Sequence, residues 1–185
     1  MTRKRLRPAY SDAELKALYR TPHDHRRWRD HRLRVDVTVA VARWMAGDGV
    51  DAAADLSCGN GAILSAVPAG AKYFGDIAPG YRFQGPIEDT IMQIPQVDLF
   101  VCSETLEHVD APMLVLGRIR DRARMLVLST PVDAWDDDNP EHYWAWSRED
   151  IEEMLAAAGW TLHVYATADF RPQGLPYCFG IWGVR

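Results

Sequence analysis

A glycine turn that follows an apolar run, within residues 54–64, constrains the fold of this chain more than any other feature. The run at residues 50–56 reads as a buried strand, and a helix start is marked where apolar residues resume at Ala62. Between them stand Gly59 and Gly61, and glycines are favoured where the backbone needs a positive φ or passes close to another group. A helix N-terminus beyond such a turn offers unpaired N–H groups, so this stretch predicts a ligand-binding strand–turn–helix unit.

Strand-like and helix-like segments alternate along the rest of the chain. Two capping boxes mark helix starts, because Ser11 is followed by Glu14, and Ser147 by Asp150, at the required spacing. This alternation is typical of an α/β fold with a mostly parallel sheet, in which ligands bind at the carboxyl ends of the strands. We expect strands at residues 50–56, 72–75, 81–84, 97–103, 124–129, 160–166 and 177–184, and helices from residue 11 and over residues 22–45, 62–67, 111–118 and 147–158.

The composition fits one globular domain and disfavours several other classes. Of the 185 residues, 48% are hydrophobic and 25% are charged, and no run of about 18 apolar residues predicts a membrane span. The basic first residues are not followed by the apolar stretch of a secretory signal. Cys58, Cys102 and Cys178 form no CxxC pair, so we expect buried, reduced thiols in a cytoplasmic protein.

Positive charge is concentrated in the N-terminal part of the chain. Residues 1–34 carry eleven Lys and Arg against four Asp and Glu, whereas residues 35–185 carry ten against twenty-two. A basic segment on an acidic body predicts either an anionic partner or a helix face that pairs with the body itself. We expect residues 1–46 to form N-terminal helices on the substrate side, and residues 47–185 to form the ligand-binding domain.

Three features at the predicted strand ends indicate which ligand the turn binds. Asp55 ends the first strand, and Asp76, at the end of the second, is placed to accept hydrogen bonds from ribose hydroxyls. After the third strand, residues 85–89 offer an apolar side chain that could cover an adenine face. The turn lacks the GxGxxG fingerprint of nicotinamide enzymes, and its preceding acid suits the cationic aminoacyl end of S-adenosylmethionine better than a pyrophosphate. We therefore predict S-adenosylmethionine as the cofactor.

On these motifs the chain resembles the class I S-adenosylmethionine-dependent methyltransferases over residues 50–185. The first motif of that family is similar to ADLSCGNGAIL at 54–64, the second to YFGDIAPGY at 73–81, the fourth to FVCSETLEHV at 100–109, and the strand beyond to LVLSTP at 126–131. The resemblance implies a methyltransferase with an α/β, Rossmann-like three-layer sandwich. Its seven-stranded, mostly parallel sheet would have an antiparallel last strand.

The resemblance also implies roles for individual residues. Asp55 and the backbone of residues 57–61 would hold the aminoacyl end of the cofactor, and Asp76 would hold its ribose. Pro86 stands where an Asp often binds the adenine amino group, so we expect an acid of residues 88–89, or water, to make that contact. The full predicted cofactor set is Asp55, Ser57, Cys58, Gly59, Asn60, Gly61, Asp76, Ile77, Ile87, Glu88 and Ser103.

A second group of polar residues follows the fourth strand. If residues 103–108 begin a helical turn, Glu104, Glu107 and His108 lie on one face, where they could bind a divalent cation or relay a proton. Bacterial small-RNA 3′-terminal 2′-O-methyltransferases and some quinone-biosynthesis O-methyltransferases resemble this chain in a Glu-x-x-Glu-His motif, which in the RNA enzymes binds a metal together with a later His. By that resemblance the metal ligands would be Glu104, Glu107, His108 and His142, and the catalytic groups Glu104, His108 and His142. Alternatively, Glu107 and His108 only cap the turn and fix the pocket wall.

Three functions follow from these patterns. The first is methylation of an oxygen or nitrogen of a small molecule, the second is methylation of an RNA end or other nucleic acid through the basic N-terminal segment, and the third is S-adenosylmethionine binding without catalysis. Ordinary DNA base methylation is disfavoured, because residues 129–131 do not match the Asn-Pro-Pro-aromatic motif of amino-methylating DNA enzymes.

Two segments are expected to select the substrate. Arginines of the second N-terminal helix could close over the cofactor or bind phosphates, and aromatic residues of the loop at 132–146 could form a lid or belong to the core. The oligomeric state, monomer or homodimer, is left open. The arginines are Arg26, Arg27, Arg29, Arg32 and Arg34, and the aromatic residues are Trp135, Tyr143, Trp144 and Trp146.

Overall fold

The computed structural model describes residues 2–25 and 27–185. Within these residues, seven strands form one sheet, and a separate two-stranded ribbon is formed by β1 (Lys4–Arg5) and β7 (Trp144–Ala145). The strands of the large sheet are β2 (Val50–Asp55), β3 (Ala69–Asp76), β4 (Phe83–Gln84), β5 (Val97–Ser103), β6 (Ala123–Val132), β8 (Leu162–Asp169) and β9 (Cys178–Val184).

The strand order in the large sheet is β4-β3-β2-β5-β6-β9-β8. The pairs from β4 to β6 are parallel, while β9 runs antiparallel to both β6 and β8. The predicted seven-stranded, mostly parallel sheet with an antiparallel last strand is therefore confirmed. Because β2, β3 and β5 are parallel neighbours, their carboxyl ends meet at one edge of the sheet.

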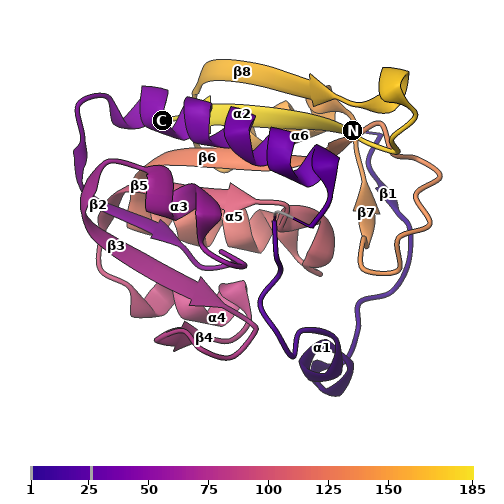
Figure 1. Ribbon diagram of the computed structural model, residues 1–185, viewed down its shortest axis with the longest axis horizontal. Helices are drawn as coiled ribbons and strands as arrows, with labels where there is room; N and C mark the ends of the chain where they lie inside the picture. Colours follow the sequence, from indigo (N-terminus) through magenta and orange to yellow (C-terminus); the bar gives the residue numbers. More distant parts are fainter. Residues whose placement is uncertain (1, 26) are drawn as a thin grey trace.

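Helices cover both faces of the sheet, which gives three layers (Figure 1). α2 and α3 contribute to one apolar cluster, centred on Val41, Met45 and Ile63, and α4, α5 and α6 contribute to the other. The core strand β5 is buried along most of its length, as its apolar run VDLFVCS predicts. The helices are α1 (Asp12–Leu18), α2 (Arg29–Ala46), α3 (Ala62–Ala66), α4 (Ile87–Thr90), α5 (Pro112–Arg122) and α6 (Arg148–Ala157).

The largest departure from the expected elements lies before α2. A helix was expected from residue 22, but α2 begins at Arg29, and Trp28 before it has an extended backbone. The preceding segment instead packs on the glycine turn: Asn60 donates a hydrogen bond to Asp24, and a Cβ added at Gly59 would lie 2.8 Å from the ring of His25. These tertiary contacts outweigh the local helix signals of Thr21-Pro22.

Other differences are smaller. β3 begins at Ala69 rather than at residue 72, because Val50 of β2 pairs with Ala69, and α4 was not expected at all. The ribbon joining β1 to β7 was also missed, since two-residue strands carry almost no pattern. All three cysteines are buried and free, as expected. No helix in the described part of the chain is long and apolar enough to cross a membrane.

The aromatic residues at 143, 144 and 146 pack against other parts of the protein, as the core alternative expects, whereas a lid stays a prediction. Trp146 is in the core, and its indole N–H donates to Thr130 and to the Pro131 carbonyl. Trp144 is half-buried under the Arg5 guanidinium, whose carbon lies 4.8 Å from the ring centroid. Tyr143 is buried, and its hydroxyl accepts a hydrogen bond from the backbone of Tyr10.

Both predicted capping boxes are present, and they allow a matched test. Ser147→Ala removes the side chain that accepts the N–H of Asp150 at the start of α6, so we expect a loss of about 1 kcal/mol in the free energy of unfolding in urea. Ser11→Ala removes the same cap from α1, but none of the described residues of α1 belongs to either core cluster. It should therefore change global stability much less. Equal losses would contradict this view of α1.

Candidate functional site

The predicted cofactor residues surround one cavity at the carboxyl edge of the sheet. The cavity has a volume of about 1050 Å³, which suits a cofactor together with a small second ligand. Its walls come from the ends of β2, β3 and β5, from the N-terminal segment, and from the loops around residues 85–89, 139–143 and 175–179. The predicted site residues that line it are Ser57, Gly59, Asp76, Ile77, Ile87, Glu88, Ser103, Glu104, His108 and His142.

The glycine turn has the geometry that its sequence predicts. Gly59 and Gly61 have φ values of 52° and 75°, which disfavour residues with a Cβ atom. The N–H of Ser57 donates to Asp55 (3.1 Å), and the N–H of Gly59 donates to Asp76 (2.7 Å). The two carboxylates thus hold the turn across two neighbouring strands.

Four predicted cofactor residues support this turn from outside the cavity. Asp55 and Cys58 are buried beneath it, Gly61 opens α3, and Asn60 faces the N-terminal segment through its bond to Asp24. A direct contact between these side chains and the cofactor therefore stays a prediction.

Burial shapes the acid–base properties of the two carboxylates. Burial raises the pKa of Asp55 to about 8, despite the opposing hydrogen bond from Ser57, and nearby Asp76 contributes in the same direction. Burial also raises the pKa of Asp76, against hydrogen bonds from the N–H groups of Ala78 and Gly59. Its two oxygens offer about four acceptor positions, and the backbone N–H groups of Ala78, Gly59 and Ile77 leave one of them for a hydroxyl group.

Arg34 is the site residue whose importance the sequence did not reveal. Its side chain is 1% exposed and reaches from α2 to the end of β5, where it donates to Ser103 (2.7 Å) and approaches Nδ1 of His25 (3.2 Å). Its Nε has no hydrogen-bond partner. The sequence signal that could have identified Arg34 is helical spacing, because Arg34 falls on the same buried face of α2 as Thr38, Val41 and Met45.

The other predicted N-terminal arginines have different positions. Arg27 lines the cavity and stacks over Trp28, with 4.5 Å from guanidinium carbon to ring centroid. Arg29 and Arg32 are exposed on α2. Arg26 lies outside the described residues.

The predicted group of Glu104, Glu107, His108 and His142 forms only in part. Glu107, His108 and His142 bring one ligand atom each to within 4.8 Å of one another. Glu104 lies outside this group, so the expected helical face of Glu104, Glu107 and His108 is wrong. The reason is that the φ of 52° at Glu104 and the extended φ of Thr105 break the turn, and helical geometry begins only at Leu106. Glu104 instead accepts a hydrogen bond from Ser129 and lies 3.9 Å from Arg34.

Both histidines have one ring nitrogen fixed by a neighbour. Nδ1 of His108 donates to the carbonyl of Glu141 (2.9 Å), which leaves its Nε2 as a free acceptor. Burial and the nearby His142 hold the pKa of His108 well below its usual range, so the ring is neutral. Burial and the neighbouring Glu104 raise the pKa of Glu107, whose buried Oε1 has no hydrogen-bond partner.

No family model matches the chain, and no curated protein matches it in sequence. Solved structures do match in fold. The 1,6-didemethyltoxoflavin-N1-methyltransferase of Burkholderia thailandensis, with bound S-adenosylhomocysteine, is 18% identical at a TM-score of 0.67, over 97% of this chain and 92% of that one. A small RNA methyltransferase is 15% identical at a TM-score of 0.65, over 98% of this chain but only 26% of that one.

A third match limits what the fold alone can say. The (4+2)-cyclase SpnF is 14% identical at a TM-score of 0.67, over 89% of this chain and 84% of that one. One fold therefore carries different reactions, and activity must be argued from the site. What the comparisons establish is that this chain has the fold of the class I S-adenosylmethionine-dependent methyltransferases.

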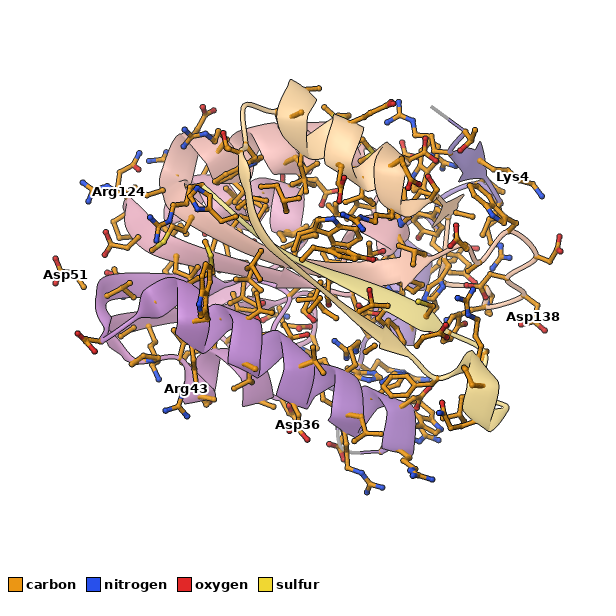
Figure 2. The ribbon with its side chains drawn as sticks, turned by 90° about the horizontal axis from the view of Figure 1, so that it is seen from above. Lys4, Asp36, Arg43, Asp51, Arg124 and Asp138 are labelled. Atoms are coloured by element: carbon orange, nitrogen blue, oxygen red, sulfur yellow. The ribbon has the colours of Figure 1, made fainter. Side chains whose placement is uncertain are left out.

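The raised pKa of Asp55 predicts a pH dependence of stability. The native state keeps a proton on Asp55 up to about pH 8, whereas an unfolded chain releases it near 3.8, so the free energy of unfolding should fall as pH rises through this window. Asp55→Asn should flatten the decline by up to about 1.4 kcal/mol per pH unit in urea titrations between pH 4 and 8. The control is Asp51→Asn, an exposed site at the opposite end of β2 (Figure 2). An unchanged slope in Asp55→Asn would refute the assignment.

Proposed function

We propose that this protein is an S-adenosylmethionine-dependent methyltransferase that methylates an oxygen or nitrogen of a small-molecule acceptor. The observation that carries the proposal is the buried Arg34 guanidinium with its unpartnered Nε, next to the glycine turn and in the same cavity as Asp76. S-adenosylmethionine has a carboxylate at one end and ribose hydroxyls in its middle, so it needs a cationic donor and a carboxylate acceptor at one site.

The residues present fit this cofactor. A buried guanidinium without a full set of partners is costly, and a carboxylate beside Arg34 would satisfy it with charge-assisted hydrogen bonds. Asp76 retains an acceptor position for the ribose, as described above. Ile77, Ile87 and Glu88 line the same cavity and are the residues available to contact the adenine.

The charge of the cavity favours a small acceptor over a nucleic acid. Eight carboxyl side chains line it against two arginines, and a phosphodiester chain would be repelled by such a wall. The first basic residues are also engaged by the protein itself: Arg5 pairs with Asp110 at 2.5 Å, and Arg7 donates to the Asp137 carbonyl. The carboxyl side chains are Asp24, Asp30, Asp76, Glu88, Asp89, Glu104, Asp110 and Glu141.

We also infer that Glu107, His108 and His142 can hold a divalent cation. The two imidazoles and the unpartnered Glu107 Oε1 are a donor set that such ions accept. A bound cation would lower the pKa of an acceptor hydroxyl. Glu104 is not part of this set, because its carboxylate is engaged by Ser129.

The chain's own residues supply positioning and a proton acceptor. In methyl transfer the acceptor's lone pair forms the new bond to the methyl carbon, the carbon–sulfur bond breaks, and the sulfonium becomes a neutral thioether. The acceptor also loses one proton, and Nε2 of His108, which lines the cavity, is placed to take it when no cation occupies that nitrogen. Most of the rate gain then comes from holding the acceptor in line with the methyl group.

The likeness to a small RNA methyltransferase keeps an RNA end as a second candidate acceptor. Transfer of radiolabelled methyl groups into metabolite, RNA and protein fractions, with and without a chelator, separates the possibilities. We expect label in the metabolite fraction, and a chelator-sensitive signal if the cation participates. Label in RNA that is lost as salt is added would favour the second candidate, and cofactor binding without label would favour a non-catalytic protein.

Arg34 provides the sharpest test of cofactor binding. Arg34→Met should weaken binding of S-adenosylhomocysteine, measured by calorimetry, by at least about tenfold, because a charge-assisted contact is worth roughly 1.5–3 kcal/mol. The matched control is Arg43→Met on the outer side of the same helix (Figure 2), which should bind like the wild type. Equal affinity of both variants would rule out Arg34 as the carboxylate partner.

A further inference from the structure

We propose that Asp137 is a positioning residue that holds His142 in the Nδ1–H tautomer, so that its Nε2 is unprotonated and can act as an acceptor. This inference rests on the proposed function, because it concerns the same cavity. Asp137 lies in the loop between β6 and β7.

One side of the His142 ring is bound by Asp137. Oδ2 of Asp137 lies 2.6 Å from Nδ1 of His142, and the two side chains are 4% and 8% exposed. Oδ1 accepts from the N–H of Asn139 (2.9 Å) and from the hydroxyl of Tyr177 (3.1 Å). Both Asp137 oxygens thus act as acceptors, and the ring proton of His142 lies on Nδ1.

The other side of the ring is bound by Asn139. Its Oδ1 accepts from the N–H of Glu141 (3.0 Å), which directs its amide N–H toward Nε2 of His142 at 3.1 Å. Nε2 must then be an acceptor, so the tautomer is specified independently from both sides. A histidine serving only to fill space would need neither constraint.

This tautomer is the one that the site chemistry requires. An unprotonated Nε2 is needed to bind a cation with Glu107 and His108, and it is equally needed to receive a proton. Either would displace the amide N–H of Asn139 from that lone pair. Carboxylates that accept the other N–H of a metal-binding imidazole commonly set its orientation and affinity. The ring of His142 meets that of His108 edge-on at 4.7 Å, within the cavity wall.

Replacing the carboxylate by an amide should reverse the tautomer. In Asp137→Asn the side-chain oxygen is still needed by the N–H of Asn139 and the hydroxyl of Tyr177, so the new NH₂ group faces Nδ1 of His142. Nδ1 can then only accept, which moves the ring proton to Nε2. That proton would point at the amide N–H of Asn139 and block the lone pair that the site uses.

The test is nitrogen-15 NMR of the histidine side chains in the full chain. We expect the wild type and Asp136→Asn, an exposed acid of the same loop, to show Nδ1–H for His142, and Asp137→Asn to show Nε2–H. We also expect Co²⁺, used as the probe for the cluster, to bind Asp137→Asn at least about tenfold more weakly. A His142 that keeps Nδ1–H in Asp137→Asn would overturn the proposal.

Two further measurements keep the outcomes separate. Titration with S-adenosylhomocysteine tests the proposed function by itself, because among the described residues Asp137 contacts neither the glycine turn nor Arg34. If the wild type fails to bind this ligand, the proposed function is refuted, while the tautomer result still stands. If Asp137→Asn does not fold, the tautomer of His142 in the wild type still tests the proposal. A strongly downfield Nδ1 proton that is absent from His142→Gln supports the proposal, and an Nε2–H tautomer in the wild type overturns it.

Discussion

The contact between Arg34 and the end of β5 ties the N-terminal part of the chain to the sheet. A fully buried guanidinium is costly unless it is paired, and here it reaches Ser103, His25 and the vicinity of Glu104. Ser103 and Glu104 stand together at the end of β5, and His25 belongs to the segment before α2. The shape of the cavity therefore depends on one side chain of α2 that joins the N-terminal segment to the edge of the sheet.

Around this contact, the protein concentrates buried polar groups at one edge of an otherwise apolar sheet. Asp55 and Asp76 hold the glycine turn, while Glu107, His108 and His142 gather on the far side of β5. Such groups cost stability unless each finds a partner, and the described structure leaves two unpartnered atoms here, Arg34 Nε and Glu107 Oε1. Both lie where a bound ligand could supply the missing interaction.

The sequence predicted the sheet and the turn well, because both depend on local patterns. The apolar run of β5 and the glycines at 59 and 61 need no long-range information. Arg34 and the start of α2 were harder, since a buried arginine and a non-helical Trp28 are decided by contacts with distant strands. Glu104 was placed wrongly for a similar reason: its positive φ is imposed where its backbone N–H bonds to Ser129 of the neighbouring strand.

The most direct test of the central claim is a crystal structure of the protein with S-adenosylhomocysteine. We expect ligand density in the cavity at the ends of β2, β3 and β5, with the carboxylate on Arg34, the ribose hydroxyls on Asp76 and the adenine near Ile87. Density elsewhere, or an aminoacyl end turned away from Arg34 in a well-occupied complex, would contradict the proposed binding site.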